Sequence, residues 1–573
     1  MRNKLFLAII FLLLFAFGKV NAQQQEMYTF CTGSSYAYLI DTTATASSQY
    51  FARWAVSSTA YSAHFLNDTI YQSTGSGSGG GGSWGSIKKW ACTSINTATN
   101  VWTYAVTGGH HDICPLPNGN VLIIVHDSKT AAQVTAAGGS FSSTVQSEKI
   151  QEIHQTGANT GVVVWEWKLW DHICQSVNSS IASTYVSSVA ANPQLMNVRY
   201  NMTSDWIHMN GIDYNPVLDQ IVVSSHFMNE VYVIDHSTTT AQAATHSGGN
   251  AGKGGDFLYR WGNPATYGCT AGGNGITLNT IHDARWVSAN NSKFPNYISM
   301  FHNNGGGTAK AVLFLPPHNG YNYTYTSGSV LPPTTCTQPA VQTITGVPDM
   351  GSVFVCDNGN ILMTKPNTAF YECSGLGTTY QTISVSTNQA DRLKKCEVVG
   401  PFPTASASLS TVCANSPITL NSSAISPLQT SPTFSYSWSS TPAGYTSSTQ
   451  SPTVTPADPG TYTYTVTVTS GGCSRTASVN VTVTDCLGVA ESSNENVSLN
   501  VYPNPTSGVI NLNDEFVLNN NFEAIVSNSF GKMVYYGKNI NNIDLSAYSD
   551  GLYYLSVKQQ NGNIINKKII LIK

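Results

Sequence analysis

Charged side chains are scarce in this sequence, and the scarcity limits what the protein can bind. Only 10% of the 573 residues are Asp, Glu, Lys or Arg, and the formal net charge is −4. A chain without a basic excess has no electrostatic basis for binding nucleic acid or an anionic membrane. Glycine (48 residues) and tyrosine (29 residues) are abundant instead, which is typical of extracellular β-structure rich in turns.

Long apolar runs are also missing, except at the start of the chain. Two basic residues precede an apolar run over 5–17, and small residues (Val-Asn-Ala) follow at 20–22. This layout predicts a signal peptide over residues 1–22, cleaved after Ala22. The run is shorter than the roughly 20 residues that a membrane-spanning helix needs. We therefore expect a mature chain without a transmembrane segment, secreted or held at the cell surface.

No two cysteines have the Cys-x-x-Cys spacing of a zinc site, although the chain holds 12 cysteines. In an exported chain such cysteines form disulfides, and we predict a bridge between Cys413 and Cys473. Close His-x-His and Glu-x-x-His spacings are absent from the sequence as well, so no metal or cofactor is expected. The one ion that this pattern leaves room for is a structural calcium.

A large N-terminal segment, residues 27–400, contains all 13 histidines and ten of the 11 tryptophans. Within it, residues 114–127, 215–235 and 356–373 each place an Asn-Gly or Asp-centred turn beside a β-branched strand. Such turns join antiparallel strands tightly because their central residues tolerate positive φ. Repeated hairpins of this kind predict an all-β fold, a β-propeller with long, decorated blades.

The next segment, residues 402–486, has no histidine and is rich in Ser, Thr and Pro. Short alternating strands are predicted at 433–440 and 460–473. With Trp438 placed between two cysteines, the segment resembles an immunoglobulin-like or PKD-like β-sandwich. A polar linker follows at 487–498.

The C-terminal segment, residues 499–573, carries two specific motifs. These are "LNVYPNPTSGVINL" (499–512) and "LSAYSDGLYYLSV" (545–557). Together they resemble the C-terminal sorting domain of type IX secretion. The resemblance implies that the type IX machinery carries the protein across the outer membrane.

Histidines in polar turns form the most informative pattern of the large segment. They stand in "GGHHDICPLPNGN" (108–120), "SDWIHMNGIDYNP" (204–216), "NTIHDARW" (279–286) and "SMFHNNGGG" (299–307). In this order, and with "LYRWGNP" (258–264), the motifs resemble the bacterial arylsulfotransferase family. That family implies a six-bladed propeller that moves a sulfuryl group from a phenolic sulfate donor to a phenolic acceptor through a sulfohistidine, without a nucleotide sulfate.

The same motifs imply site residues. Catalytic roles fall to His208, His282, His302 and Lys310. Substrate-binding roles fall to His110, His111, Asn210 and Arg285. A neutral imidazole is a competent nucleophile near pH 7, and cationic groups stabilise sulfate oxygens. The resemblance leaves open which histidine attacks sulfur.

One departure from the family pattern concerns a late histidine. In the best-known branch the nucleophile lies after the "HDA" motif, but no histidine follows His318 here, and Met350 and Cys356 stand in that region. The alternative function is therefore a non-catalytic secreted propeller for binding or adhesion. Four other histidines are assigned structural or exposed positions: His172, His226, His236 and His318.

Overall fold

Turn residues with positive φ angles divide the N-terminal part of the chain into hairpins. β13 (Met209–Asn215), β14 (Gln220–Ser225) and β15 (Glu230–Asp235) are joined through turns at Asp219 (φ 53°) and Asn229 (φ 55°). Asn and Asp enter this left-handed region more easily than bulkier side chains. Successive strands therefore pair antiparallel in sequence order.

The structure is a computed structural model. It describes residues 26–41, 50–77, 82–269, 277–339, 341, 343–374, 379–384, 387–429, 431–485, 499–513, 516–517, 521–560, 562 and 564–573. The predicted signal peptide and the predicted linker lie outside the described residues. Strands dominate and helices are short, so the all-β prediction is confirmed. No helix of the described part is long and apolar enough to cross a membrane.

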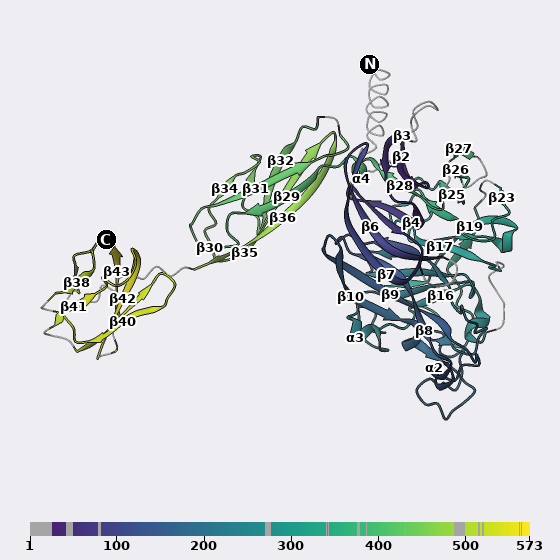
Figure 1. Cartoon of the computed structure of the whole chain (residues 1–573), viewed down its shortest axis with the longest axis horizontal. Coiled ribbons are helices and arrows are strands. Elements are labelled where there is room, and N and C mark those ends of the chain that lie inside the picture. The colour runs from purple at the N-terminus through teal and green to yellow at the C-terminus, as the bar shows by residue number, and fades with distance from the viewer. Residues whose placement is uncertain are drawn as a thin grey trace, which may run out of the picture.

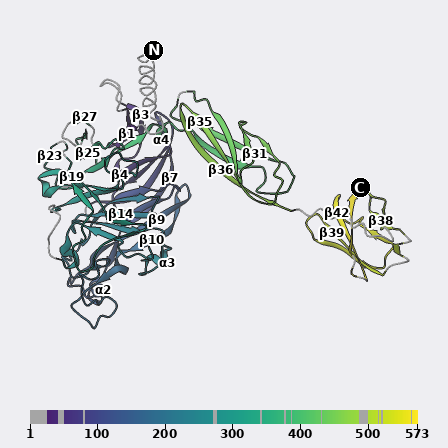
Figure 2. The same cartoon turned by 180° about the vertical axis from the view of Figure 1, so that it is seen from behind.

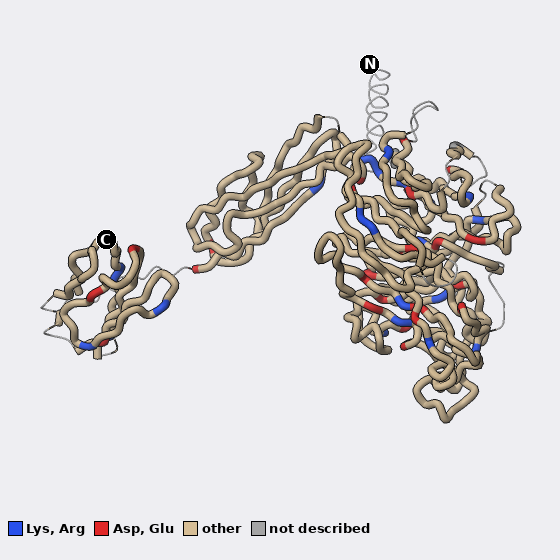
Figure 3. The backbone as a smooth tube through the Cα atoms, in the orientation of Figure 1, with Lys and Arg blue, Asp and Glu red and all other residues tan. Residues whose placement is uncertain are grey.

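Three bodies follow one another along the chain, a large one and two smaller ones (Figures 1 and 2). Charged residues of both signs are scattered along the large body (Figure 3). The second body holds very few of them.

The large body contains five sheets of at least four strands in its described part. One has the order β28-β1-β2-β3: β28 (Ala390–Lys394), β1 (Glu26–Thr32), β2 (Tyr36–Asp41) and β3 (Tyr50–Ala55). The next runs in sequence order through seven strands: β4 (Thr59–Leu66), β5 (Thr69–Thr74), β6 (Ser83–Ser94), β7 (Thr97–Pro115), β8 (Val121–Lys129), β9 (Val145–Gly157) and β10 (Thr160–Lys168).

Three more sheets complete this set. The first has the order β13-β14-β15-β16, in which β16 (Tyr259–Trp261) pairs with β15. The second has β17 (Ile281–Trp286), β18 (Ile298–His302), β19 (Thr308–Leu315) and β22 (Thr335–Thr337), with β23 (Ile344–Thr345) paired to β19. The third has β24 (Ser352–Val355), β25 (Ile361–Lys365), β26 (Ala369–Cys373) and β27 (Thr379–Ile383).

Short elements fill the connections of the large body. They are β11 (Ile173–Cys174) with β12 (Met196–Asn197), β20 (His318–Asn319) with β21 (Asn322–Tyr323), the α-helices α2 (Ala131–Ala136), α3 (Thr240–Ala243) and α4 (Lys395–Val398), and 3-10 turns at Leu169–His172, Pro264–Tyr267 and Asn304–Gly306.

Two features hold these sheets in one body. β1 pairs with β28, so the first and last strands of the body share a sheet. β7 is long enough to pair with β6 over its first part and with β8 over its second. Both pairings include Gly109, where a Cβ atom would lie 2.6 Å from the Trp84 ring, so only glycine fits. Between neighbouring sheets, buried apolar side chains such as Trp167 and Trp206 form the core.

The second body packs two sheets around the buried ring of Trp438. One sheet has β29 (Phe402–Ala407), β31 (Ile418–Ile425) and β34 (Thr453–Val454). The other has β30 (Thr411–Cys413), β36 (Cys473–Thr484), β35 (Gly460–Ser470), β32 (Ser435–Thr441) and β33 (Thr446–Ser447).

The predicted bridge between Cys413 and Cys473 is wrong. Cys473 is bonded to Cys396 in α4 of the large body, and Cys413 is engaged in a disulfide of its own. Arg475 explains the pairing, because its guanidinium donates to the main-chain oxygen of Cys396 at 2.8 Å and to Asn67 at 2.9 Å. The start of β36 is thus held against the large body.

The third body has its own apolar core. Its two sheets have the orders β37-β38-β41 and β40-β39-β42-β43. The strands are β37 (Val501–Tyr502), β38 (Val509–Leu512), β39 (Phe522–Asn528), β40 (Met533–Lys538), β41 (Asn542–Asp544), β42 (Gly551–Gln559) and β43 (Ile564–Leu571).

Candidate active site

Four neighbouring strands of the large body bring polar residues together. His111 lies in the second half of β7, His208 directly precedes β13, His282 is in β17, and Met350 precedes β24. β13 packs against both β7 and β17, and β17 packs against β24. His111, His208 and Met350 have φ angles of 52°, 54° and 67°. Non-glycine residues adopt such angles rarely, and often at functional sites.

His208 is held on both sides of its ring. Its Nδ1 lies 2.7 Å from Oδ2 of Asp205, and its Nε2 lies 3.3 Å from Nε2 of His111. The hydrogen bond from His208 lowers the pKa of Asp205 even though burial opposes this, so Asp205 is a carboxylate that accepts the Nδ1 proton. The Nε2 lone pair of His208 then points away from Asp205, toward His111.

A second pair continues this series of contacts. His111 Nδ1 lies 3.1 Å from Nδ1 of His110, and Nε2 of His110 lies 2.8 Å from Oε2 of Glu148. The other oxygen of Glu148 accepts the backbone N–H of Met209 at 3.1 Å. Burial lowers the pKa of His110 to about 3 and raises that of Glu148 to about 8. Both groups are therefore neutral at pH 7, and their contact is a hydrogen bond between uncharged partners.

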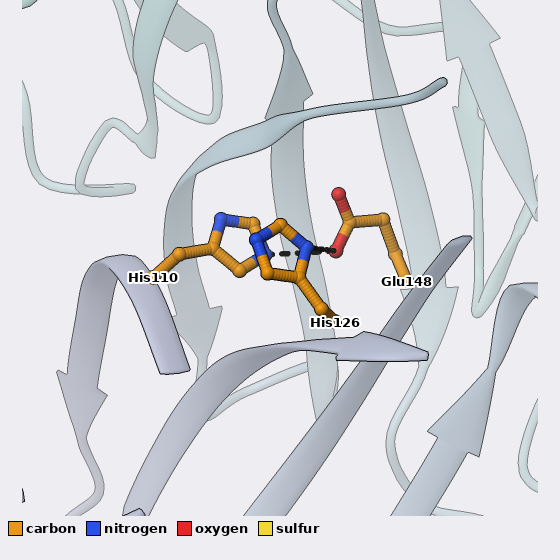
Figure 4. Close-up of side chains that lie close together, drawn as sticks. All are labelled: His110, His126 and Glu148. Atoms are coloured by element: carbon orange, nitrogen blue, oxygen red, sulfur yellow. Dashed lines mark hydrogen bonds and ion pairs between the residues drawn. The ribbon is translucent and has the colours of Figure 1, made fainter. Parts of the chain in front are cut away.

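Figure 4 shows that His126 lies against this pair. Its ring stacks on that of His110, with centroids 3.9 Å apart and planes 6° from parallel. The side chain is 5% exposed, and neither ring nitrogen has a hydrogen-bond partner. Burial lowers the pKa of His126 to about 4, so this ring is neutral too.

His282 has both ring nitrogens occupied. Nδ1 lies 2.8 Å from Oδ1 of Asn303, whose amide group donates to two main-chain oxygens, so Nδ1 carries the proton. Nε2 accepts the backbone N–H of Met350 at 3.1 Å. Burial lowers the pKa of His282 to about 3. This neutral ring fixes the Met350 turn.

Sequence reasoning missed His226. Its ring centroid lies 5.1 Å from that of His208 and 5.4 Å from that of His282. Nε2 lies 3.0 Å from Asp349, while burial lowers the pKa of the ring. From the sequence, His226 is placed among the structural or exposed histidines. Its backbone N–H donates to the oxygen of His208, so the pairing of β13 with β14 sets the two residues side by side.

A small cavity of about 30 Å³ opens beside these rings. Its lining includes Tyr61, His111, Asn210, His282 and Met350. Tyr61 and Met350 also line an adjoining hollow of about 330 Å³. Asn210 is fixed there, because its amide donates to the main-chain oxygen of Ile281 at 2.7 Å and its oxygen accepts from Ser224 at 2.8 Å.

Three of the residues predicted for the site lie elsewhere. His302 pairs in register with Ile281, the neighbour of His282, so its side chain is on the other face of the sheet. Lys310 donates to Gln338 at 3.1 Å. Arg285 is bound to Asp283 and Asp391 and lines a different cavity, of about 620 Å³. The structure brings together the other five predicted residues.

Two groups of side chains have atoms close enough to share a metal ion. One is His110, His126 and Glu148, whose Oε2 lies 2.8 Å from Nε2 of His110 and 4.0 Å from Nδ1 of His126. The other is His172, His246 and Asp256, whose Oδ1 lies 2.9 Å from Nδ1 of His172 and 2.7 Å from Nδ1 of His246.

Comparisons with known proteins give the family of each part. Residues 94–326 match the model of the arylsulfotransferase family, residues 406–483 match a PKD domain model, and residues 500–573 match a secretion system C-terminal sorting domain. No curated protein matches the sequence.

Several solved structures are similar at low identity. The extracellular domain of a putative hybrid two-component system from B. thetaiotaomicron is 10% identical with a TM-score of 0.28; the match covers 90% of this chain and 56% of that one. This chain thus spans little more than half the length of that relative. A periplasmic gluconolactonase from Pseudomonas aeruginosa is 11% identical with a TM-score of 0.36; the match covers 63% of this chain and 98% of that one.

A putative 6-phosphogluconolactonase from Bacteroides fragilis is also 11% identical, with a TM-score of 0.35, and the match covers 64% of this chain and 98% of that one. The order of family matches agrees with the three bodies of the structure. The histidine cluster described above is built by residues of the first match together with Tyr61 and the Met350 turn. The chain therefore carries an arylsulfotransferase family domain, then a PKD-like domain, then a secretion sorting domain.

Proposed function

We propose that the large body is a six-bladed β-propeller and that its histidine cluster transfers sulfuryl groups. Each blade would have four strands, with β7 serving as the outer strand of one blade and the inner strand of the next. The six inner strands would be β28, β4, the second half of β7, β13, β17 and β24. Packing of β4 on β7, β7 on β13, β13 on β17, β17 on β24 and β24 on β28 supports this ring.

The reaction that we propose moves a sulfuryl group from a phenolic sulfate ester to a phenolic acceptor, without a nucleotide sulfate donor. His208 is the nucleophile, and the observation that carries this assignment is its contact with Asp205. A carboxylate that accepts the Nδ1 proton leaves the Nε2 lone pair available for attack. His282 is a weaker candidate because Asn303 and Met350 occupy both of its nitrogens.

The surroundings suit a sulfate ester of a phenol. The hollow of about 330 Å³ next to the rings falls within the size range of small-molecule sites. His111 and Asn210 line the inner cavity. The fixed amide of Asn210 would donate to a sulfate oxygen, which strengthens catalysis when the donor is fixed in advance, and the His111 ring would face the oxygen of the leaving phenol. His302, Lys310 and Arg285 have no direct role in this proposal.

The sorting domain supports secretion or attachment at the cell surface. We propose that the type IX machinery is its partner. We further propose that the signal peptide over residues 1–22 is removed during export.

The test is an assay of the purified protein with 4-nitrophenyl sulfate, with and without added phenol. We expect nitrophenol release that rises with phenol, because a sulfohistidine waits for its acceptor. His208→Asn should abolish release and the acid-labile sulfohistidine. Asp205→Asn should slow release by roughly 10²–10⁴-fold because the wrong ring nitrogen is then protonated.

His318→Asn, on the exposed β20, is the matched control and should leave release unchanged. Wild-type protein that releases no nitrophenol with any phenol would contradict the proposal and favour the binding alternative. Full activity in His208→Asn would place the nucleophile elsewhere.

A further inference from the structure

We propose that Glu148 supplies the proton that the leaving phenolate needs and takes it back from the acceptor, acting through His110 and His111. This inference rests on the proposed transfer at His208. The observation behind it is an unbroken series of contacts from Glu148 to the nucleophile. Its links measure 2.8 Å from Glu148 to His110, 3.1 Å from His110 to His111 and 3.3 Å from His111 to His208.

The hydrogen bonds fix the direction of the series. Oε1 of Glu148 accepts the N–H of Met209, which leaves Oε2 to carry a proton toward Nε2 of His110. His110 then donates from Nδ1 to Nδ1 of His111, and His111 donates from Nε2 to Nε2 of His208. At the far end His208 donates to Asp205. Every contact holds one proton, and the His110 and His111 rings are neutral because burial lowers the pKa of both.

The surroundings of Glu148 keep it protonated. Its side chain is fully buried on β9, and burial penalises a carboxylate that lacks a cation. The titratable groups that face it are His110 on β7, His126 on β8, and Asp205 and His208 before β13. The two nearest rings are neutral, and Asp205 opposes ionisation of Glu148.

His126 completes this environment without joining the series. Its ring covers one face of His110, and its Nδ1 lies 4.0 Å from the Glu148 carboxylate, beyond hydrogen-bond distance (Figure 4). A neutral aromatic cover of this kind excludes water from the bond between Glu148 and His110. The proton of Glu148 therefore has one route, which leads through His110.

In the first half-reaction Nε2 of His208 forms a bond to sulfur, and the bond from sulfur to the phenol oxygen breaks. His111 gives its Nε2 proton to the leaving phenolate and receives a proton at Nδ1 from His110. His110 receives a proton at Nε2 from Glu148. The products are a phenol, an N-sulfo imidazolium at His208 and a Glu148 carboxylate, so the net charge of −1 brought by the sulfate ester is conserved.

The second half-reaction reverses each step. The acceptor phenol forms a bond to sulfur as the nitrogen–sulfur bond breaks, and its proton passes to Nε2 of His111. The Nδ1 proton of His111 moves to His110, and the Nε2 proton of His110 moves to Glu148. No other reactant is required, and the chain returns to its starting state. Glu148 thus releases one proton and regains it in each turnover.

The test is Glu148→Gln. Glutamine has the same shape, accepts from Met209 and donates to His110, but it cannot release a proton. We expect the burst of phenol release from unsubstituted phenyl sulfate to slow by roughly 10²–10⁴-fold, the contribution of general acid catalysis. Release from 4-nitrophenyl sulfate should slow far less, because nitrophenolate leaves without a proton. The rate of the wild-type burst with phenyl sulfate should also fall as pH rises through about 8, because Glu148 then loses its proton. The variant should not show this decline.

Glu152→Gln is the matched control. Glu152 is also a buried carboxylate on β9 and contacts a different histidine, His236, at 3.1 Å. Its loss tests the effect of removing a carboxylate–histidine contact from the same strand. We expect the ratio of the two substrate rates in this variant to match the wild type.

Distinct outcomes separate the two proposals. Wild-type protein without transfer overturns both. If the wild type is active and Glu148→Gln keeps both the wild-type ratio of the two substrate rates and the decline above pH 8, only the relay is overturned. The relay is also overturned if metal analysis finds one ion per wild-type chain and none in Glu148→Gln. If Glu148→Gln does not fold, the proton inventory of wild-type phenyl sulfate cleavage decides. A curved plot of the cleavage rate against the fraction of deuterium in the solvent supports the transfer of several protons. A straight line overturns the relay.

Discussion

His236 couples the stability of the large body to pH. Its Nδ1 lies 2.7 Å from Asp219 and its Nε2 3.1 Å from Glu152, with the Trp165 ring packed beside it. Although burial opposes the charge, the two carboxylates raise the pKa of His236 to about 9. Compared with the ordinary value near 6.5, this difference corresponds to roughly 3 kcal/mol of folding free energy.

The sign follows from the raised pKa. The contribution is fully present below pH 6.5, where His236 is charged in the folded and unfolded chain alike, and it disappears as pH rises through about 9. We expect His236→Gln to lower the free energy of unfolding by about 2–3 kcal/mol at pH 6 and by little at pH 10. Urea unfolding at both pH values, followed by tryptophan fluorescence, measures this.

The comparison of variant and wild type cancels other titrating groups, such as Lys89, whose pKa burial lowers to about 8. An equal loss of stability at pH 6 and pH 10 would show that His236 contributes packing and not charge. A direct NMR titration of the ring that gave an ordinary pKa would refute the reasoning at its first step.

Two further predictions concern stability. Cys396→Ser opens a bridge that spans 77 residues and should lower the free energy of unfolding by up to about 4 kcal/mol, measured by denaturation under non-reducing conditions; an unchanged midpoint contradicts it. Glu230→Gln leaves the fully buried Arg260 guanidinium without its carboxylate and should cost about 3–5 kcal/mol. A double variant that also carries Arg260→Met should recover much of that loss. If the two substitutions instead lower the free energy of unfolding additively, the pairing is contradicted.

Local patterns in the sequence were sufficient for the order of the domains and for the hairpins. Turn residues such as Asp219 indicate a chain reversal because Asp and Asn tolerate positive φ angles. The motif around His208 marks a residue that the structure places directly before β13, beside His111. Positions whose meaning comes from a neighbouring strand were harder to predict.

His302 and His226 show why. His302 stands in a motif, but the pairing of Ile281 with His302 places its side chain on the face opposite to His282. A shift of one residue reverses a side chain's direction, and the register was not deducible from spacing. His226 is placed among the structural histidines, yet the register of β13 against β14 brings it to His208. Glu148 joins the cluster from β9, where its buried contact with His110 depends on the packing of neighbouring strands.

The disulfide prediction was wrong for a related reason. Cys473 lies in a segment with all the local features of a separate domain, and its nearest cysteine in such a fold would be Cys413. Its partner Cys396 belongs to the preceding body and meets it where Arg475 and Gln429 hold the second body against the large one. Contacts between domains leave no periodic trace in a sequence.

The pairing of β1 with β28 bears on how a protein outside the cell resists proteases. Both ends of the large body are locked in one sheet, with Phe30 opposite Asp391. A single cut in any exposed loop between them yields two fragments, each of which still contributes a strand to that sheet. The fragments cannot drift apart unless this pairing and the packing between sheets are lost together. A nicked molecule therefore keeps its architecture, and its lifetime is set by the second cut and not by the first.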